Sequence, residues 1–153
     1  MLPSNIFDKA VLIVRDPFDA LVAEWNRQFA GYIGHAPKSS FQSDGGMEWK
    51  SYVYKGIQQW RDFNIAWHHY FTSTGNLHVL TYELLAKNTR VEVTKLLAFL
   101  NITPIDQTLK CCMSRKESLF HRKKHGTKPV RFDASMNKTI NEIKYLVYKK
   151  LGI

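Results

Sequence analysis

Residues 10–29 read AVLIVRDPFDALVAEWNRQF, a stretch that predicts a buried β-strand turning directly into an amphipathic helix. Residues 10–14 are mostly β-branched, which is typical of a parallel strand covered on both faces. Asp16 stands where a helix N-cap belongs, and Pro17 follows at the first helical position. Arg15 is therefore expected at the carboxyl end of the strand, beside the amino end of the helix.

This position of Arg15 predicts an anion site. Ligands of open parallel sheets bind outside the carboxyl ends of the strands, where free N–H groups of helix N-termini attract anions. The forked guanidinium of an arginine suits a phosphate group. An arginine at a strand end is nevertheless often a plain surface charge, so a second element is needed to support the site.

The residues after the strand predict one helix and then a loop. The apolar face of the helix is expected to bury Phe18, Leu21, Val22, Trp25 and Phe29. Asn26 is expected to lie off that face. Gly31 and Gly34 end the helix. Residues 34–46 (GHAPKSSFQSDGG) predict an exposed loop, with a substrate-gating lid as the alternative.

A second strand and helix follow a long helical segment. Aromatic residues recur at helical spacing over residues 47–71, which indicates core packing in one kinked helix or in two helices. Residues 77–82 (LHVLTY) then predict a strand ending at Tyr82. A helical crossover between strands of one sheet requires them to run parallel. Tyr82 and Arg15 are therefore expected at the same edge of the sheet.

Three further segments complete the chain. Residues 91–100 predict a helix capped near Asn88 or Thr89, and residues 105–113 a shorter one. Residues 114–128 (SRKESLFHRKKHGTK) predict a basic loop, and residues 137–151 a closing amphipathic helix. A chain of 153 residues is expected to form one domain, and no apolar run is long enough to cross a bilayer.

The net charge of +9 comes from the last third of the chain, because residues 110–153 hold 12 basic and 3 acidic residues. Such asymmetry indicates an anionic ligand, an anionic polymer or a membrane surface, and a solvated face is the alternative. No nucleic-acid-binding signature accompanies the charge. Cys111 and Cys112 are adjacent, so we expect no disulfide between them and predict small buried side chains. We expect packing or surface roles for His68, His69 and His78.

Two stretches resemble a known family. Residues 11–29 (VLIVRDPFDALVAEWNRQF) resemble the 3′-phosphate-binding strand and helix of sulfotransferases that use 3′-phosphoadenosine-5′-phosphosulfate (PAPS). Residues 78–102 (HVLTYELLAKNTRVEVTKLLAFLNI) resemble the family's strand that ends in Tyr-Glu and its following helix. With KESLFHR at residues 116–122, the chain is most similar to the WSC-domain-containing sulfotransferases.

The resemblance implies a fold and a set of cofactor-binding residues. The fold is α/β and P-loop-NTPase-like, with a short parallel sheet near residues 10–15 and 77–82 surrounded by helices. Arg15 would hold the 3′-phosphate and Tyr82 would lie near the adenine. Arg115 and Lys116 look like the late basic element that reaches the same phosphate, with Arg122 as a second candidate. Ala23 stands where the family commonly has a phosphate-binding serine.

The same resemblance implies a reaction, but some of the groups that the reaction needs have no counterpart in residues 1–153. A sulfuryl group would pass from PAPS to an acceptor hydroxyl, on a glycan or another molecule, with no metal. The family's phosphosulfate loop and catalytic base normally precede the Arg-Asn/Asp-Pro strand, and residues 1–14 contain neither. We therefore expect a carboxyl-terminal portion of a sulfotransferase domain. The alternative is a non-catalytic remnant that binds a nucleotide or an anionic glycan.

The compartment is expected by resemblance alone. Relatives of the WSC-domain type are Golgi membrane proteins with an amino-terminal anchor, and residues 1–153 contain no targeting or transmembrane segment. Asn137-Lys138-Thr139 is an acceptor pattern for N-glycosylation. Asn101-Ile102-Thr103 is a second such pattern, disfavoured by the proline that follows it.

Overall fold

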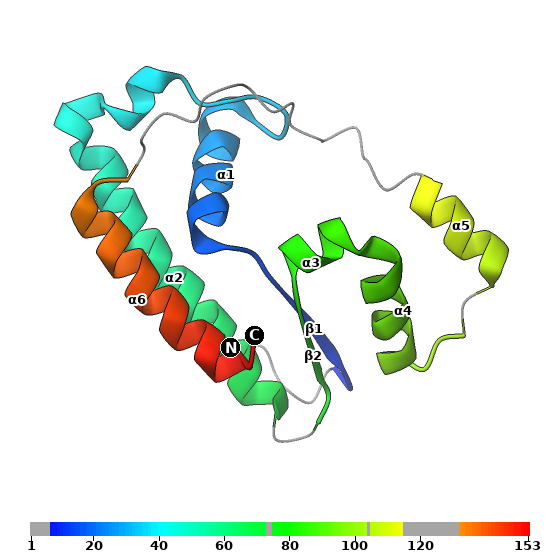
Figure 1. The fold of residues 1–153 in the computed structure, drawn as a ribbon. Helices are drawn as coiled ribbons and strands as arrows, with labels where there is room; N and C mark the ends of the chain where they lie inside the picture. Colours follow the sequence, from blue (N-terminus) through cyan, green and yellow to red (C-terminus); the bar gives the residue numbers. More distant parts are fainter. Residues whose placement is uncertain (1–6, 73–74, 104, 115–131) are drawn as a thin grey trace.

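The computed structural model describes residues 7–72, 75–103, 105–114 and 132–153 (Figure 1). The elements in chain order are β1 (Ala10–Val14), α1 (Pro17–Ala30), the 3₁₀ turns η1 (Lys38–Phe41) and η2 (Ser43–Gly46), α2 (Met47–Thr72), β2 (Leu77–Thr81), α3 (Tyr82–Lys87), α4 (Thr89–Phe99), α5 (Asp106–Ser114) and α6 (Ala134–Leu151). The predicted α/β class, with two strands among helices, is confirmed.

The two strands pair in parallel, as the helical crossover required. Their register runs from Ala10 opposite Leu77 to Val14 opposite Thr81, so both strands end at one edge. The second strand is one residue shorter than predicted, because the Thr81 side chain caps α3 and Tyr82 is already helical. The six-residue helix α3 was not predicted.

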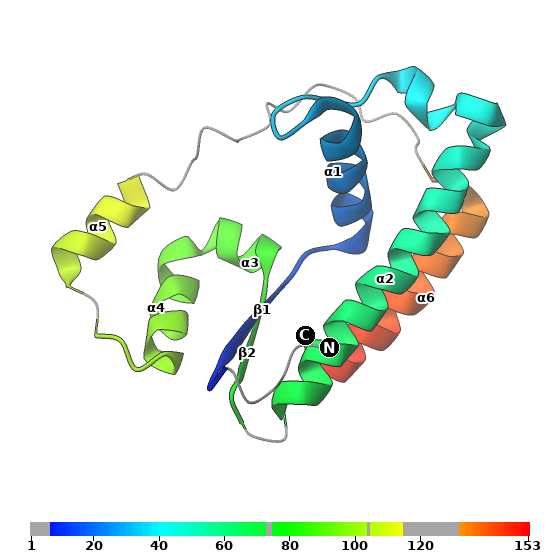
Figure 2. The ribbon, with the colours of Figure 1, turned by 180° about the vertical axis from the view of Figure 1, so that it is seen from behind.

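The prediction that β1 is covered on both faces is wrong. Leu12 and Val14 are buried in the core, whereas Ile13, pointing to the opposite face, is 51% exposed. On that face α4 covers β2, where Phe99 stacks on His78 with ring centroids 5.3 Å apart. Because α4 lies over β2 rather than β1, Ile13 keeps contact with solvent (Figures 1 and 2).

Helix α1 begins as predicted, and its buried face differs from the predicted one. The Asp16 side chain accepts a hydrogen bond from the Phe18 amide, and Pro17 is the first helical residue. Asn26 is buried and accepts a hydrogen bond of 2.9 Å from the amide of Ala36, because the following segment folds back over it. Phe29, expected in the core, is 45% exposed.

The segment between α1 and α2 contains more regular structure than the predicted exposed loop. It forms the two 3₁₀ turns and buries Ser40, whose hydroxyl accepts a hydrogen bond of 3.1 Å from the Trp25 indole. Phe41 packs against Trp49 with ring centroids 5.0 Å apart. These contacts could not be predicted from the composition of the segment, because Ser40 and Phe41 are single inward-facing residues among polar neighbours.

Helices α2 and α6 form the main packing layer and lie side by side in both views (Figures 1 and 2). Residues 47–72 form one continuous helix, so the alternative of two helices is wrong. Gly56 lets α1 approach α2 closely, since a Cβ there would lie 2.6 Å from a methyl group of Leu21. The buried residues of α2 are Trp49, Val53, Ile57, Asn64 and Phe71. Those of α6 are Met136, Ile140, Ile143, Val147 and Leu151.

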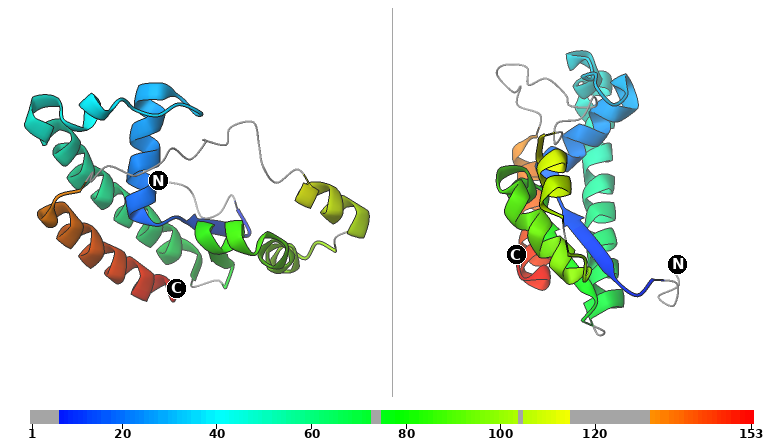
Figure 3. Two further views of the ribbon diagram at one scale, coloured as in Figure 1. Left: turned by 45° about the horizontal axis from the view of Figure 1, so that its top comes forward. Right: turned by 90° about the vertical axis from the view of Figure 1, so that its right-hand side faces the viewer.

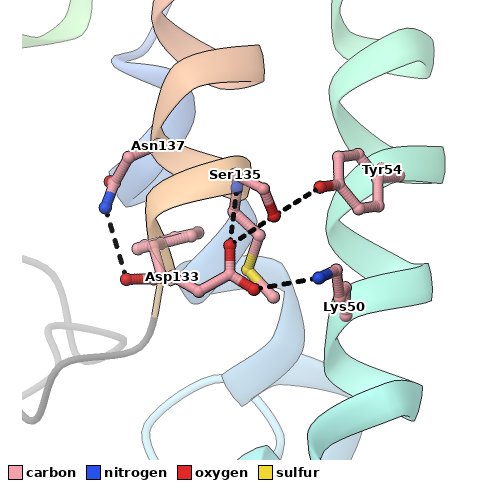
Figure 4. A network of polar contacts seen from close by, with 7 residues as sticks. Lys50, Tyr54, Asp133, Ser135 and Asn137 are labelled. Carbon is pink, nitrogen blue, oxygen red and sulfur yellow. Dashed lines mark hydrogen bonds and ion pairs between the residues drawn. The ribbon is translucent and has the colours of Figure 1, made fainter.

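The amino end of α6 is fastened to α2 by polar contacts (Figure 4). The Asp133 carboxylate caps α6 by accepting from the Met136 amide and pairs with Lys50 at 3.1 Å. Tyr54 donates to the Ser135 hydroxyl, which in turn donates to Asp133. These contacts, led by the one from Ser135, hold the pKa of Asp133 well below its usual range. The cap starts the helix three residues before the predicted position.

Helix α5 stands apart from the α2–α6 layer (Figure 3). It confirms the predicted short helix, and Leu109 is its one buried residue among those described. Cys111 and Cys112 are both free and exposed, so the prediction of buried side chains is wrong. Leu109 is the residue that α5 turns inward, and the cysteines two and three positions after it face solvent.

Candidate functional site

Arg15 and Tyr82 meet at the edge where both strands end. Arg15 follows Val14, and Tyr82 follows Thr81, the residue paired with Val14. The guanidinium carbon of Arg15 lies 4.7 Å from the centroid of the Tyr82 ring. The parallel register therefore brings together two residues that are 67 positions apart in the sequence. The prediction that Arg15 and Tyr82 lie at the same edge of the sheet is confirmed.

The pair has unused binding capacity. The Nε atom of Arg15 is buried and has no hydrogen-bond partner among the described residues. An unpartnered buried donor is costly, so such an atom indicates a missing acceptor. Tyr82 is 45% exposed, which leaves part of its ring open to a ligand. A cationic fork beside a flat aromatic surface suits a phosphorylated nucleotide.

Three different helices contact Arg15 and Asp16, two through backbone atoms and one through the Asp16 side chain. The Trp60 indole on α2 donates a hydrogen bond of 3.2 Å to the Arg15 carbonyl. The Asp16 amide donates to the Glu83 carboxylate on α3 at 3.0 Å. The Lys144 ammonium on α6 pairs with the Asp16 carboxylate at 2.5 Å. The turn that presents Arg15 is thus connected to α2, α3 and α6.

Sequence reasoning missed the contribution of α6 to this site. Lys144 and Tyr148 belong to a helix predicted only as packing, and Lys144 lies 5.3 Å from the centroid of the Tyr148 ring. Burial, followed by the negative charges of Asp16 and Glu83, raises the pKa of Tyr148 to about 12. Their partners on other elements, Asp16, Trp60 and Glu83, lie more than 60 positions away in the sequence, so no local pattern indicates these contacts.

Three of the predicted cofactor-binding residues lie outside the described residues: Arg115, Lys116 and Arg122. The basic loop of residues 114–128 likewise lies outside them, apart from Ser114 at the end of α5. Their roles stay predictions. Of the site residues predicted from the sequence, the structure brings Arg15 and Tyr82 together.

The histidines occupy packing and surface positions, as expected. Burial, followed by the charges of Lys150 and His69, lowers the pKa of His68. His69 is exposed. The Nε2 atom of His78 is buried without a partner among the described residues, behind the Phe99 ring. None of the three contacts Arg15 or Tyr82 in an interaction that the structure records.

Two other features lie apart from this edge. A shallow hollow on the second half of α2 contains none of the predicted site residues and is lined by Arg61, Asp62, Ile65, Ala66, His69 and Tyr70. The described part of the chain contains no group of three His, Cys, Asp or Glu side chains that could hold a metal ion.

Comparison with known proteins defines the class. The profile of the family described as "Sulfotransferase domain" matches residues 1–147, so the chain belongs to that family. It is 34% identical over 146 residues to the WSCD family member CG9164 of Drosophila melanogaster, covering 95% of this chain and 45% of the relative. It is 36% identical over 147 residues to the WSCD family member GA21586 of Drosophila pseudoobscura pseudoobscura, covering 95% and 46%.

A third relative gives the same result. The WSCD family member AAEL009094 of Aedes aegypti is 33% identical over 146 residues, covering 95% of this chain and 45% of the relative. The chain therefore spans less than half the length of the curated relatives it matches. No solved structure matches the chain. Both predicted resemblances, to the sulfotransferases and to the WSC-type branch, are confirmed.

Proposed function

We propose that this chain forms the nucleotide-binding portion of a sulfotransferase that uses PAPS as its donor. The main support for this proposal is the contact between Arg15 and Tyr82 at the carboxyl edge of two parallel strands. Membership of the sulfotransferase domain family supports the reaction class. The relatives are more than twice as long as the chain, which agrees with one portion of a larger protein.

In this proposal Arg15 binds the 3′-phosphate of the donor. Its buried Nε atom has a hydrogen bond to give, and a phosphate oxygen is an acceptor of matching charge. The exposed part of the Tyr82 ring lies beside the adenine. Arg115, Lys116 and Arg122 add positive charge at the same phosphate. Ala23 lacks a hydroxyl, so its side chain cannot donate a hydrogen bond to the phosphate.

The reaction is in-line transfer of a sulfuryl group from PAPS to an acceptor hydroxyl on a glycan or another molecule. A general base takes the acceptor proton, and cationic donors stabilise the charge that develops on the leaving phosphate. Arg15 lies at the far end of the donor from the sulfate, so its task is to bind and orient. The 5′-phosphosulfate contacts and the general base have no assigned residue in this chain.

The proposal is tested by equilibrium binding of 3′-phosphoadenosine 5′-phosphate to the full chain. Arg15→Ala should weaken binding by about one to two orders of magnitude, because a charge-assisted bidentate contact is lost. The matched control is Arg61→Ala on α2, which removes an arginine paired with Asp62 away from the site. Equal losses in both variants, or no binding by the unchanged protein, would refute the site.

We also propose a location in the Golgi membrane or lumen, on the resemblance to the WSC-domain-containing sulfotransferases, the family to which the relatives are assigned. Among the described residues no helix is both long and apolar enough to cross a membrane. Asn101 is exposed after α4, whereas Asn137 donates its amide to the Phe132 carbonyl at the start of α6. A protein in this compartment is exposed to N-glycosylation, so glycosidase treatment of the chain made in a eukaryotic cell should release a glycan. Asn101→Gln and Asn137→Gln variants would identify the acceptor.

A further inference from the structure

Helix α6 sends one charged side chain into the turn that carries Arg15. The Lys144 ammonium pairs with the Asp16 carboxylate at 2.5 Å, although the two residues are 128 positions apart. Their side chains are only 29% and 23% exposed. A pair that is this well shielded is weakened less by salt than one on the open surface. It is therefore a specific link between the last helix and the strand-to-helix turn.

Asp16 is committed to partners on three sides. Its Oδ1 atom accepts from the Phe18 amide, which caps α1, and its Oδ2 atom pairs with Lys144. Its own amide donates to Glu83 on α3. Because Asp16 directly follows Arg15, these three contacts together fix the direction in which the Arg15 side chain leaves the sheet.

A second route joins α6 to the same turn. Lys144 lies over the ring of Tyr148, whose centroid is 6.4 Å from that of Trp60. Trp60 donates its indole hydrogen to the Arg15 carbonyl. The carbonyl of Arg15 and the carboxylate of Asp16 are thus both connected to the one segment of α6 that holds Lys144 and Tyr148.

We propose that Lys144 is a positioning residue for the nucleotide site, acting through Asp16 and not by touching the nucleotide. The inference rests on the proposed function, in which Arg15 binds the 3′-phosphate. With Lys144 in place, Arg15 is held in the orientation that the Tyr82 ring supports. Without it, the Asp16 carboxylate loses its cation and the turn gains freedom. Binding then has to pay the cost of ordering it.

The test is the affinity for 3′-phosphoadenosine 5′-phosphate at a temperature where each variant is fully folded. Lys144→Gln should weaken binding about tenfold, the scale of coupling between residues in one ion-pair network. Lys144→Arg should restore most of that loss. The control Lys138→Gln removes an exposed lysine from the same helix and should change affinity less than about twofold. A lower melting temperature with unchanged affinity would show a merely structural role and overturn the proposal.

A double-mutant cycle separates positioning from direct contact. Asn is as good an N-cap as Asp, so Asp16→Asn keeps the α1 cap while removing the charge that Lys144 meets. If Lys144 acts through Asp16, adding Lys144→Gln to Asp16→Asn should cause no further loss of affinity. Losses that add would show that Lys144 does not act through Asp16 and would contradict the proposed positioning role.

A measurement without nucleotide keeps the two proposals distinguishable. In the NMR spectrum of the free protein, Lys144→Gln should shift the signals of the Asp16 amide and the Trp60 indole, and Lys138→Gln should not. If the unchanged protein fails to bind nucleotide, the proposed function is refuted. The NMR measurement still shows whether Lys144 is coupled to the Asp16 turn. Unshifted signals in Lys144→Gln would overturn the positioning role whatever the nucleotide affinity.

Discussion

The indole N–H of Trp60 donates a hydrogen bond of 3.2 Å to the backbone carbonyl of Arg15, joining the middle of α2 to the end of β1. Trp60→Phe keeps an aromatic ring and removes this donor. We predict a loss of about 1 kcal/mol in the free energy of unfolding, because the carbonyl loses its partner in a partly buried place. Urea denaturation measures it. The control is Phe63→Leu, at a position 57% exposed on the same helix.

Tyr82 should act through its ring and not through its hydroxyl. Tyr82→Phe keeps the surface that faces the Arg15 guanidinium, and Tyr82→Leu removes it. We predict nearly unchanged affinity for 3′-phosphoadenosine 5′-phosphate in the first variant and a loss of about fivefold in the second, the worth of a cation–π contact at a partly exposed site. Equal losses in the two variants would point to the hydroxyl and argue against ring stacking.

The packing of α6 against α2 should dominate the stability of the domain. Ile140 is fully buried, so Ile140→Ala should lower the free energy of unfolding by about 2–5 kcal/mol through lost contacts and the cavity left behind. Leu146→Ala changes a residue that is 59% exposed on the same helix and should cost less than about 0.5 kcal/mol. Comparable losses would mean that the two helix faces are wrongly assigned.

The Asp133 network should make stability depend on pH. Hydrogen bonds from Ser135 and Met136, with Lys50, lower the pKa of Asp133 in the folded state below its value of 3.8 in the unfolded chain. A lowered folded pKa means that the stabilisation is complete above the unfolded pKa and is lost as pH falls towards the folded pKa.

We therefore predict that Asp133→Asn lowers the melting temperature at pH 7 and that the difference from the unchanged protein shrinks as the pH falls below about 4. Thermal unfolding followed by circular dichroism at several pH values measures this difference. Glu142→Gln, which removes an exposed carboxylate from the same helix, is the control. A difference that stays constant from pH 7 to pH 3 would contradict the assigned role of the carboxylate.

Local patterns predicted the parts of the fold that depend on neighbouring residues. The β-branched run, the Asp16 cap and Pro17 located β1 and the start of α1, and the crossover implied a parallel pair. The site edge followed from these, because parallel strands end together. Arg15 and Tyr82 could therefore be paired from the amino-acid sequence alone.

Contacts between distant segments could not be predicted in this way. Asn26 is buried because residues after α1 fold back over it, and Cys111 and Cys112 are exposed because α5 buries Leu109 instead. The link from Lys144 to Asp16 depends on how α6 lies along α2. None of these arrangements leaves a periodic or compositional signal in the sequence.

The most direct test of the central claim compares two ligands that differ by one phosphate. Affinities for 3′-phosphoadenosine 5′-phosphate and adenosine 5′-phosphate are measured for the unchanged protein and for Arg15→Ala. If Arg15 binds the 3′-phosphate, the unchanged protein should prefer the first ligand by about tenfold or more, and Arg15→Ala should lose that preference. An unchanged preference in Arg15→Ala would contradict the assignment of Arg15 to the 3′-phosphate.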